Sequence, residues 1–176
     1  MESKRLKFYP PSLKDQPQIL AGVIESKSEL EEFLPWVPFA LTESDSIQDT
    51  QNAMKNFKSF TNELRFSLYE KNTQEFVGCV GLIIRNKKIP FFEIGYWLRS
   101  SMQGKGYITE AVNEIERYAF IELNGKRIEI QTAMSNLKSI AVAKRCGYEL
   151  EAKLFNHRLL PSWALDGTLI YAKTTR

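Results

Sequence analysis

Hydrophobic and polar positions along the chain follow two different periods, and the change between them is clearest from residue 91 to residue 119. Over residues 91–98 apolar and aromatic side chains fill both alternating sets of positions, which is typical of a strand buried on both faces. From Ile108 the apolar residues recur every three or four positions, which predicts an amphipathic helix. The segment between them, residues 100–106, contains two glycines and is predicted to be a loop.

The same patterns predict the other elements. Further strands are expected at residues 5–9, 65–70, 75–84, 127–133, 148–155 and 165–173. Helices are expected from 12 or 15 to about 26, over 28–34, from 42–49 to about 60, over 108–124 and over 139–146. Ser28 and Glu31 have the spacing of a capping box, and Gly78 and Gly81 indicate a bulge or a close approach in their strand. This order predicts an α/β fold in a single domain, residues 1–176, with a mixed sheet and helices on both faces.

The loop before the long helix has the chemistry of an anion site. Gly104 and Gly106 allow backbone N–H groups to approach a ligand closely, and Lys105 adds a positive charge. The N-terminus of the helix adds further donors and a positive dipole end, so a phosphate or pyrophosphate would fit. A tight strand-to-helix turn is the alternative interpretation. The loop matches neither the Walker A motif nor the dinucleotide fingerprint, which would need a third glycine.

Composition narrows the class of protein. Hydrophobic residues make up 43% of the 176 positions and charged residues 26%, which is typical of a soluble globular domain. A net charge of +3, spread along the chain, gives no reason to expect a nucleic-acid partner. No apolar run approaches the roughly 20 residues of a membrane span, and the first residues lack the apolar region of a signal peptide. We therefore expect a cytoplasmic protein with no membrane partner.

The cysteines and the histidine argue against metal and thiol chemistry. Cys79 and Cys146 have no nearby Cys partner, and His157 is the only histidine, so no metal site is expected. Two buried free thiols in a reducing compartment are the simplest interpretation. A nucleophilic pair of one cysteine with His157 is a minor alternative.

Several short motifs, taken in order, carry a resemblance to a known family. They are Leu34-Pro35-Trp36, Gly78-x-x-Gly81, Glu93-Ile94-Gly95-Tyr96, Gln103-Gly104-Lys105-Gly106-Tyr107 with Thr109-Glu110-Ala111, Asn136-x-x-Ser139, Lys144-x-x-Gly147-Tyr148 and Asp166-Gly167. Along almost its whole length the chain resembles the GNAT superfamily of acetyl-CoA-dependent N-acetyltransferases. It looks most like the Rim-type ribosomal-protein N-terminal acetyltransferases.

The resemblance implies a mostly antiparallel central sheet that is splayed between two strands, with acetyl-CoA as co-substrate. It assigns the CoA pyrophosphate to Gln103, Gly104, Lys105, Gly106 and Tyr107, and the pantetheine arm to Trp97, Leu98 and Arg99. The first position of the pyrophosphate motif, usually Arg or Gln, is Ser101 here, so a side-chain contact is lost while backbone donors remain. Asn136 would contact the pantetheine arm, or else cap a helix. Lys144 would reach the CoA phosphates, or else lie free in solvent.

Attack of a neutral amine on a thioester requires a proton acceptor, donors for the developing oxyanion and a route for the leaving thiolate. Glu93, an acid in an apolar strand, is the general-base candidate; a solvent-facing or Arg-paired carboxylate is the alternative. The resemblance adds Glu151 as a second acid. Many members carry a tyrosine acid where this chain has Ala143, and the Rim-type pattern suggests Ser139 instead. A backbone N–H at or near Leu98 would polarise the carbonyl.

The acceptor is less well determined by the sequence. Neutralising an α-amine at pH 7 costs about 1 kcal/mol, against about 4.6 kcal/mol for a lysine, which favours a protein N-terminus. Trp36 and Phe39, in a Pro-rich loop, either fill the core or line a substrate cleft. A polyamine, aminoglycoside or amino acid is the rival acceptor, and an acidic pocket would favour it. A CoA-binding module without turnover is the second rival. Either a monomer or a homodimer is expected.

Overall fold

The computed structural model describes residues 1–175 and contains one mixed sheet of seven strands in the order β1-β2-β3-β4-β5-β7-β6. The strands are β1 (Leu6–Tyr9), β2 (Glu63–Glu70), β3 (Phe76–Asn86), β4 (Phe91–Leu98), β5 (Arg127–Ala133), β6 (Glu149–Leu159) and β7 (Leu165–Thr174). Only the β4–β5 pair is parallel, and the other neighbouring pairs are antiparallel. The predicted mixed, mostly antiparallel sheet is confirmed.

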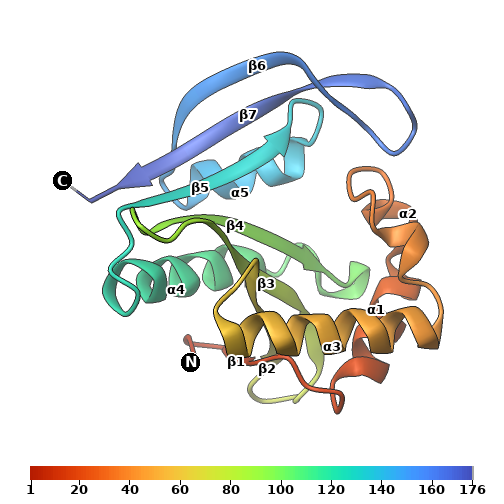
Figure 1. Ribbon diagram of the computed structural model, residues 1–176. Helices are drawn as coiled ribbons and strands as arrows, with labels where there is room; N and C mark the ends of the chain where they lie inside the picture. The colour runs from red at the N-terminus through yellow and green to blue at the C-terminus, as the bar shows by residue number, and fades with distance from the viewer. Residues whose placement is uncertain (176) are drawn as a thin grey trace.

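Helices cover both faces of this sheet, as predicted (Figure 1). They are α1 (Gln16–Glu25), α2 (Lys27–Leu30), α3 (Glu43–Ser59), α4 (Tyr107–Ile121) and α5 (Leu137–Arg145), with short 3-10 turns η1 (Val37–Phe39) and η2 (Ser100–Met102). Cys79 of β3 packs in the cluster that contains α1, whereas its neighbour Val80 packs in the cluster that contains α4. Successive strand residues point to opposite faces, so α1 and α4 lie on opposite sides of the sheet.

The sheet is split between β4 and β5. These strands pair only over Phe91–Glu93 and Arg127–Glu129, at the N-terminal end of each. Beyond that point β4 continues along β3, whereas β5 continues along β7, and Figure 1 shows the two diverging. The predicted splay is therefore present, and it leaves one edge of each strand without a partner strand among the described residues.

The second helix differs from the expectation. It spans Lys27–Leu30 rather than residues 28–34, Ser26 occupies its N-cap position, and no side chain caps it. Ser28 Oγ instead donates to Glu29 Oε2 at 3.0 Å, so the capping box with Glu31 does not form. The chain continues in turns after Leu30, with the Leu34 amide donating to the Leu30 carbonyl oxygen at 2.9 Å.

No helix within residues 1–175 has both the length and the apolar character that crossing a membrane requires.

Candidate active site

A cleft of about 1330 Å³ lies where β4 and β5 part. Most of the residues predicted for the site line it, namely Trp36, Phe39, Glu93, Trp97, Leu98, Gln103, Gly104, Asn136 and Ser139. Six do not: Arg99, Lys105, Gly106, Tyr107, Lys144 and Glu151. Segments that are far apart in sequence therefore meet around one opening, with the glycine loop and α5 beside it and the segment from α2 to η1 across from it.

The glycine loop presents free amides. Gly104 and Gly106 have φ angles of 74° and 78°, in the left-handed region that favours glycine. The N–H groups of Gly104, Lys105 and Gly106 make no hydrogen bond to any part of the chain that the structure describes. A Cβ built on Gly104 would meet nothing within 4 Å. The loop is thus an open cradle of donors at the N-terminus of α4, which suits a phosphate group.

The residues before β1 hold this loop in place. Arg5 Nη1 donates to the Lys105 carbonyl oxygen at 2.9 Å, and the Arg5 guanidinium lies 4.6 Å from the centre of the Tyr107 ring. Arg5 Nε also donates to Glu110 Oε2 at 2.7 Å. Glu110 accepts two more bonds, from Ser3 Oγ and from the Arg5 amide. Burial raises the pKa of Glu110. The hydrogen bonds from Ser3 and Arg5 and the charge of Arg5 lower it by a larger amount, so the net shift of the pKa is downward.

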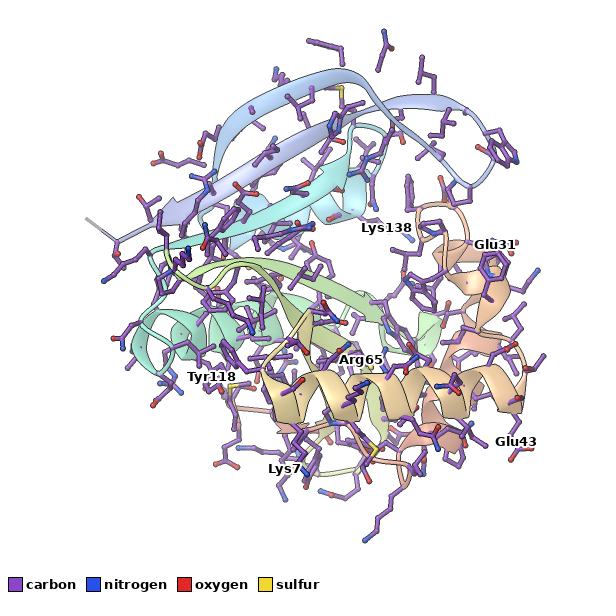
Figure 2. The ribbon with its side chains drawn as sticks, in the orientation of Figure 1. Lys7, Glu31, Glu43, Arg65, Tyr118 and Lys138 are labelled. Atoms are coloured by element: carbon purple, nitrogen blue, oxygen red, sulfur yellow. The ribbon has the colours of Figure 1, made fainter. Side chains whose placement is uncertain are left out.

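Two basic side chains border the cleft beside the glycine loop. Lys138 Nζ, labelled in Figure 2, donates to Gln103 Oε1 at 3.1 Å, and Arg145 Nε donates to Thr109 Oγ1 at 3.3 Å. Lys144, the predicted phosphate contact, is exposed and lies outside the cleft. Adjacent residues on a helix point about 100° apart, which explains why Arg145 lines the cleft and Lys144 does not.

The start of α5 places a serine hydroxyl in the cleft. Asn136 Oδ1 accepts a bond from the Ser139 amide at 3.0 Å, so Asn136 is the N-cap, which is the alternative that the sequence left open. Ser139 Oγ lies 2.8 Å from the Tyr96 hydroxyl oxygen. Burial raises the pKa of Tyr96 to about 12, which keeps the phenol protonated at neutral pH. No local pattern connects Tyr96 with Ser139, which lies 43 positions later.

Glu93 forms an ion pair with an arginine, as the alternative interpretation allows. Arg85 donates from Nε to Glu93 Oε2 at 2.9 Å and also from Nη2 to the same oxygen. The other carboxylate oxygen makes no hydrogen bond within residues 1–175. Burial raises the pKa of Glu93, and Arg85 offsets only part of that shift. Glu93 as the general base stays a prediction.

Glu151 lies apart from Glu93 and the cleft. Its side chain is 52% exposed and pairs with Arg127, whose Nη2 is 2.8 Å from Glu151 Oε2. The Arg99 side chain is bound to Glu25 and to the Phe76 carbonyl oxygen, so it supports the end of β4 from behind. Neither side chain is placed to contact a ligand in the cleft.

Aromatic side chains form one wall. Trp36 and Trp97 have ring centres 6.3 Å apart, and Phe39 is 78% exposed. Both Trp36 and Phe39 line the cleft, so they are not core residues. Their role in binding the acceptor remains a prediction.

The cleft floor contains charged residues that the sequence did not indicate. Glu63 and Arg65, from the start of β2, both line the cleft, and so does Asp49 of α3. Arg65, labelled in Figure 2, reaches α3, where its Nη2 is 2.8 Å from Asp49 Oδ2. The predicted strand began at Arg65, two residues late. Extending its alternation back by two positions would have placed Glu63 on the same face.

Both thiols stay protonated, although Cys79 lines the cleft. Cys79 and Cys146 are free and buried, as predicted, and burial raises the pKa of Cys79 to about 12 and that of Cys146 to about 11. His157 Nδ1 lies 3.0 Å from Thr168 Oγ1, so it forms a bond of its own within β6 and β7. Among residues 1–175, no group of His, Cys, Asp and Glu side chains is arranged to hold a metal ion.

Comparison with known proteins identifies the family. The model of the acetyltransferase (GNAT) domain matches residues 5–149. The chain belongs to this family. Its members are acetyltransferases that use acetyl-CoA, which confirms the predicted acyltransferase chemistry and co-substrate.

Individual relatives agree with the Rim-type resemblance. The ribosomal-protein-serine acetyltransferase of Escherichia coli (strain K12) is 28% identical over 155 residues, which are 86% of this chain and 82% of that protein. YdaF of Bacillus subtilis (strain 168), provisionally a ribosomal N-acetyltransferase, is 46% identical over 61 residues, 35% of this chain and 33% of its own length. The microcin C7 self-immunity acetyltransferase MccE, solved with acetyl-CoA and AMP, has a TM-score of 0.89 and 26% identity over 98% of this chain and 93% of that one.

Proposed function

We propose that this protein transfers the acetyl group of acetyl-CoA to the α-amine of a protein N-terminus. The observation that carries the proposal is the parted pair β4 and β5, which leads to the free amides of Gly104, Lys105 and Gly106. Such a gap accepts an extended, amide-bearing arm along the β4 edge, with a diphosphate on the loop. The acceptor is proposed from the names of the ribosomal-protein relatives and from the low cost of neutralising an α-amine.

The cofactor would be held mainly by backbone groups. We assign the pyrophosphate to the loop from Gln103 to Tyr107, and the pantetheine arm to the free edge of β4 at Trp97 and Leu98. Lys138 and Arg145 supply positive charge near the phosphates, a role that the family resemblance assigned to Lys144. The backbone at Arg99 and the capping residue Asn136 complete the predicted set.

The protein's own residues then handle two protons. A carboxylate on the cleft floor accepts a proton from the acceptor ammonium, and the sequence favours Glu93, whose Oε1 is free. The Ser139 hydroxyl, next to Tyr96, donates a proton to the departing sulfur. A thiol of pKa about 8.5 leaves readily, so a weak acid is enough for this step. A backbone N–H on the free edge of β4 polarises the acetyl carbonyl.

A small cationic amine is the second candidate acceptor, and a specific observation favours it. Five carboxylates line the cleft: Glu29, Glu32, Asp49, Glu63 and Glu93. Of the four basic residues there, Lys138 and Arg145 lie at the glycine loop, so the remaining part of the cleft is acidic. Such a surface attracts positive charge in either kind of acceptor.

The experiment offers labelled acetyl-CoA with two acceptor pools, namely cell-extract proteins and a panel of polyamines, aminoglycosides and amino acids. We expect mass spectrometry to find the label on protein N-termini, together with release of free CoA thiol. Label confined to the small amines would replace the first candidate by the second. Binding of CoA with no thiol release from either pool would support a binding module and contradict the enzyme proposal for this chain.

We further propose that the protein works in the cytoplasm, as buried free thiols suggest, and that residues 1–176 act as one domain in a monomer or homodimer.

A further inference from the structure

A bare patch of backbone lies on the cleft floor between β2 and β5. Gly81 of β3 and Gly95 of β4 are directly paired, and Gly81 also pairs with Arg65 of β2. Paired residues in a sheet point to the same face, so the missing side chains of Gly81 and Gly95 leave a continuous hollow on the cleft side. We call this pair the glycine window.

Glu63 covers one half of the window. A Cβ placed on Gly81 would collide with the Glu63 side chain, meeting both Oε1 and, at 2.9 Å, Cδ. The carboxylate of Glu63 therefore leans from β2 across β3. It makes no hydrogen bond or ion pair with any of the described residues, although it lines the cleft. Its oxygens are open to the cleft, where water can solvate them and a bound amine could take the place of that water.

The other half of the window is open. A Cβ on Gly95 would meet only Ile83 Cδ1, at 3.7 Å, which is ordinary contact. Gly95 lies two residues beyond Glu93, where β4 has already parted from β5. Directly paired residues in adjacent strands are about 4.5–5.5 Å apart, so the space over Gly95 lies within reach of the Glu63 carboxylate, directly or through one water. The same space borders the free edge of β4.

The charges around Glu63 leave it available. Arg65, on the same strand, is bound to Asp49 of α3, and the Cys79 thiol of β3 is neutral. Glu93 of β4 shares the transverse row of Glu63 and Ile83, but Arg85 occupies one of its carboxylate oxygens. Burial raises the pKa of Glu63, Arg65 lowers it in part, and Asp49 raises it further, so the net shift is upward. A raised pKa makes a carboxylate a better proton acceptor near neutral pH.

We propose that Glu63 is the catalytic residue that accepts the ammonium proton of the acceptor, with the amine held over Gly95. This inference rests on the proposed acetyltransferase function and on no particular acceptor. One ammonium proton passes to the Glu63 carboxylate, and the neutral nitrogen attacks the acetyl carbonyl carbon. The C–N bond forms and the C–S bond breaks. The second nitrogen proton passes through solvent and restores the Ser139 hydroxyl, which gives its own proton to the departing sulfur, and Glu63 returns its proton to solvent. Glu93, bound to Arg85, then adds negative charge to the part of the cleft that receives the ammonium and does not accept its proton.

The test compares Glu63→Gln with Glu75→Gln, a matched change at an exposed residue of the turn between β2 and β3. We expect Glu63→Gln to lower kcat about 100-fold, within the usual range for a general base. The kcat of the wild type should reach a plateau as the pH rises, whereas that of Glu63→Gln should keep rising to pH 9. Glu75→Gln should match the wild type in kcat. Glu63→Asp should recover part of the kcat that Glu63→Gln loses. Glu93→Gln should lower kcat but keep its plateau at high pH. All variants should bind CoA as the wild type does.

A second variant tests the place of the amine. Gly95→Ala adds one methyl group in open space, so folding should be intact. We expect it to raise the KM for the acceptor about tenfold without changing CoA affinity in calorimetry. Equal rates and pH profiles for Glu63→Gln and Glu75→Gln would overturn the assignment of Glu63 while leaving the acetyltransferase proposal intact. If the wild type released no thiol with any amine, the proposed function would fail first, and this inference with it.

Discussion

At the scale of single residues, we propose that the contact between Tyr96 and Ser139 supplies the acid group that the family resemblance places at residue 143 of α5. Ala143 itself is fully buried, and its methyl group does not line the cleft. Tyr96 stays protonated and can donate its hydrogen to Ser139 Oγ, which leaves the serine hydrogen free to move toward sulfur. We therefore propose that a residue of β4 and a residue of α5 share the acid role.

Removing the phenol tests this pair. We expect Tyr96→Phe to lower kcat about tenfold, less than the 10²–10⁴ typical of a general acid, because a thiolate is a good leaving group. The KM for acetyl-CoA should stay nearly constant. Tyr69→Phe is the matched control: it removes a phenol bound to Asp15 at 2.9 Å, outside the cleft. Steady-state kinetics that show no difference between the two variants would remove Tyr96 from the mechanism.

At the scale of elements, the turn from β4 to α4 depends on two left-handed glycines. Alanine at such a position costs about 1–2 kcal/mol in backbone strain. Gly104 and Gly147 have the same φ of 74°, and neither has a close neighbour at its Cβ position. Of these two glycines, Gly104 lines the cleft and Gly147 does not.

Gly104 and Gly147 therefore make a controlled comparison. We expect Gly104→Ala to weaken CoA binding about tenfold in calorimetry, because the strained loop no longer presents its amides as one cradle. Gly147→Ala should lose similar stability and keep its CoA affinity. A similar loss of affinity in both variants would mean that strain alone, and not the cradle, sets binding.

The brace from Arg5 to Glu110 connects the beginning of β1 to the first turn of α4. We expect Glu110→Gln to lower the free energy of unfolding by about 2 kcal/mol at pH 7, because bonds to a charged group are lost. The folded state lowers the pKa of Glu110, so its stabilisation is present above the unfolded value and is lost as the pH falls through the folded one. Urea unfolding should thus separate the two proteins at pH 7 and bring them together near pH 2. A constant difference across that range would exclude the charge as the cause.

At the scale of the whole molecule, ligand binding should join the two halves of the split sheet. The β1–β4 part carries the glycine loop, whereas β5, β7 and β6 with α5 border the cleft from the other side. A ligand between them that binds only the folded state stabilises it by mass action. The increase in thermal stability on ligand binding therefore tests whether the ligand lies between the two halves of the sheet.

We expect CoA at 100 times its Kd to stabilise the protein by about 2.7 kcal/mol, which corresponds to about 5–11 °C in Tm for a chain of this size. Differential scanning calorimetry with and without CoA measures this shift in Tm. Gly104→Ala, at the same CoA concentration, should show a smaller rise. An unchanged Tm for the wild type would contradict the location of the cofactor in this cleft.

The sequence by itself determined nearly all of the elements, the glycine loop and most of the residues that we predicted for the site. Apolar period is a local property, so residues 91–98 and 108–121 identify their strand and helix without any distant contact. Gly104 and Gly106 likewise require only their own backbone conformation. The splay, and the roles that we propose for Gln103 and Ser139, followed from the family resemblance that the motifs carry.

Only the tertiary structure decided which charged side chains have a hydrogen-bond partner among the described residues and which do not. Arg5 and Glu110 are 105 positions apart, and neither has a local pattern that predicts the other. Glu93 is held by Arg85, whereas Glu63 leans across Gly81 without a partner, and both facts depend on the register of three strands. Register and side-chain direction arise when distant segments pack together, and the energy of a buried charge depends on those neighbours rather than on its place in the sequence.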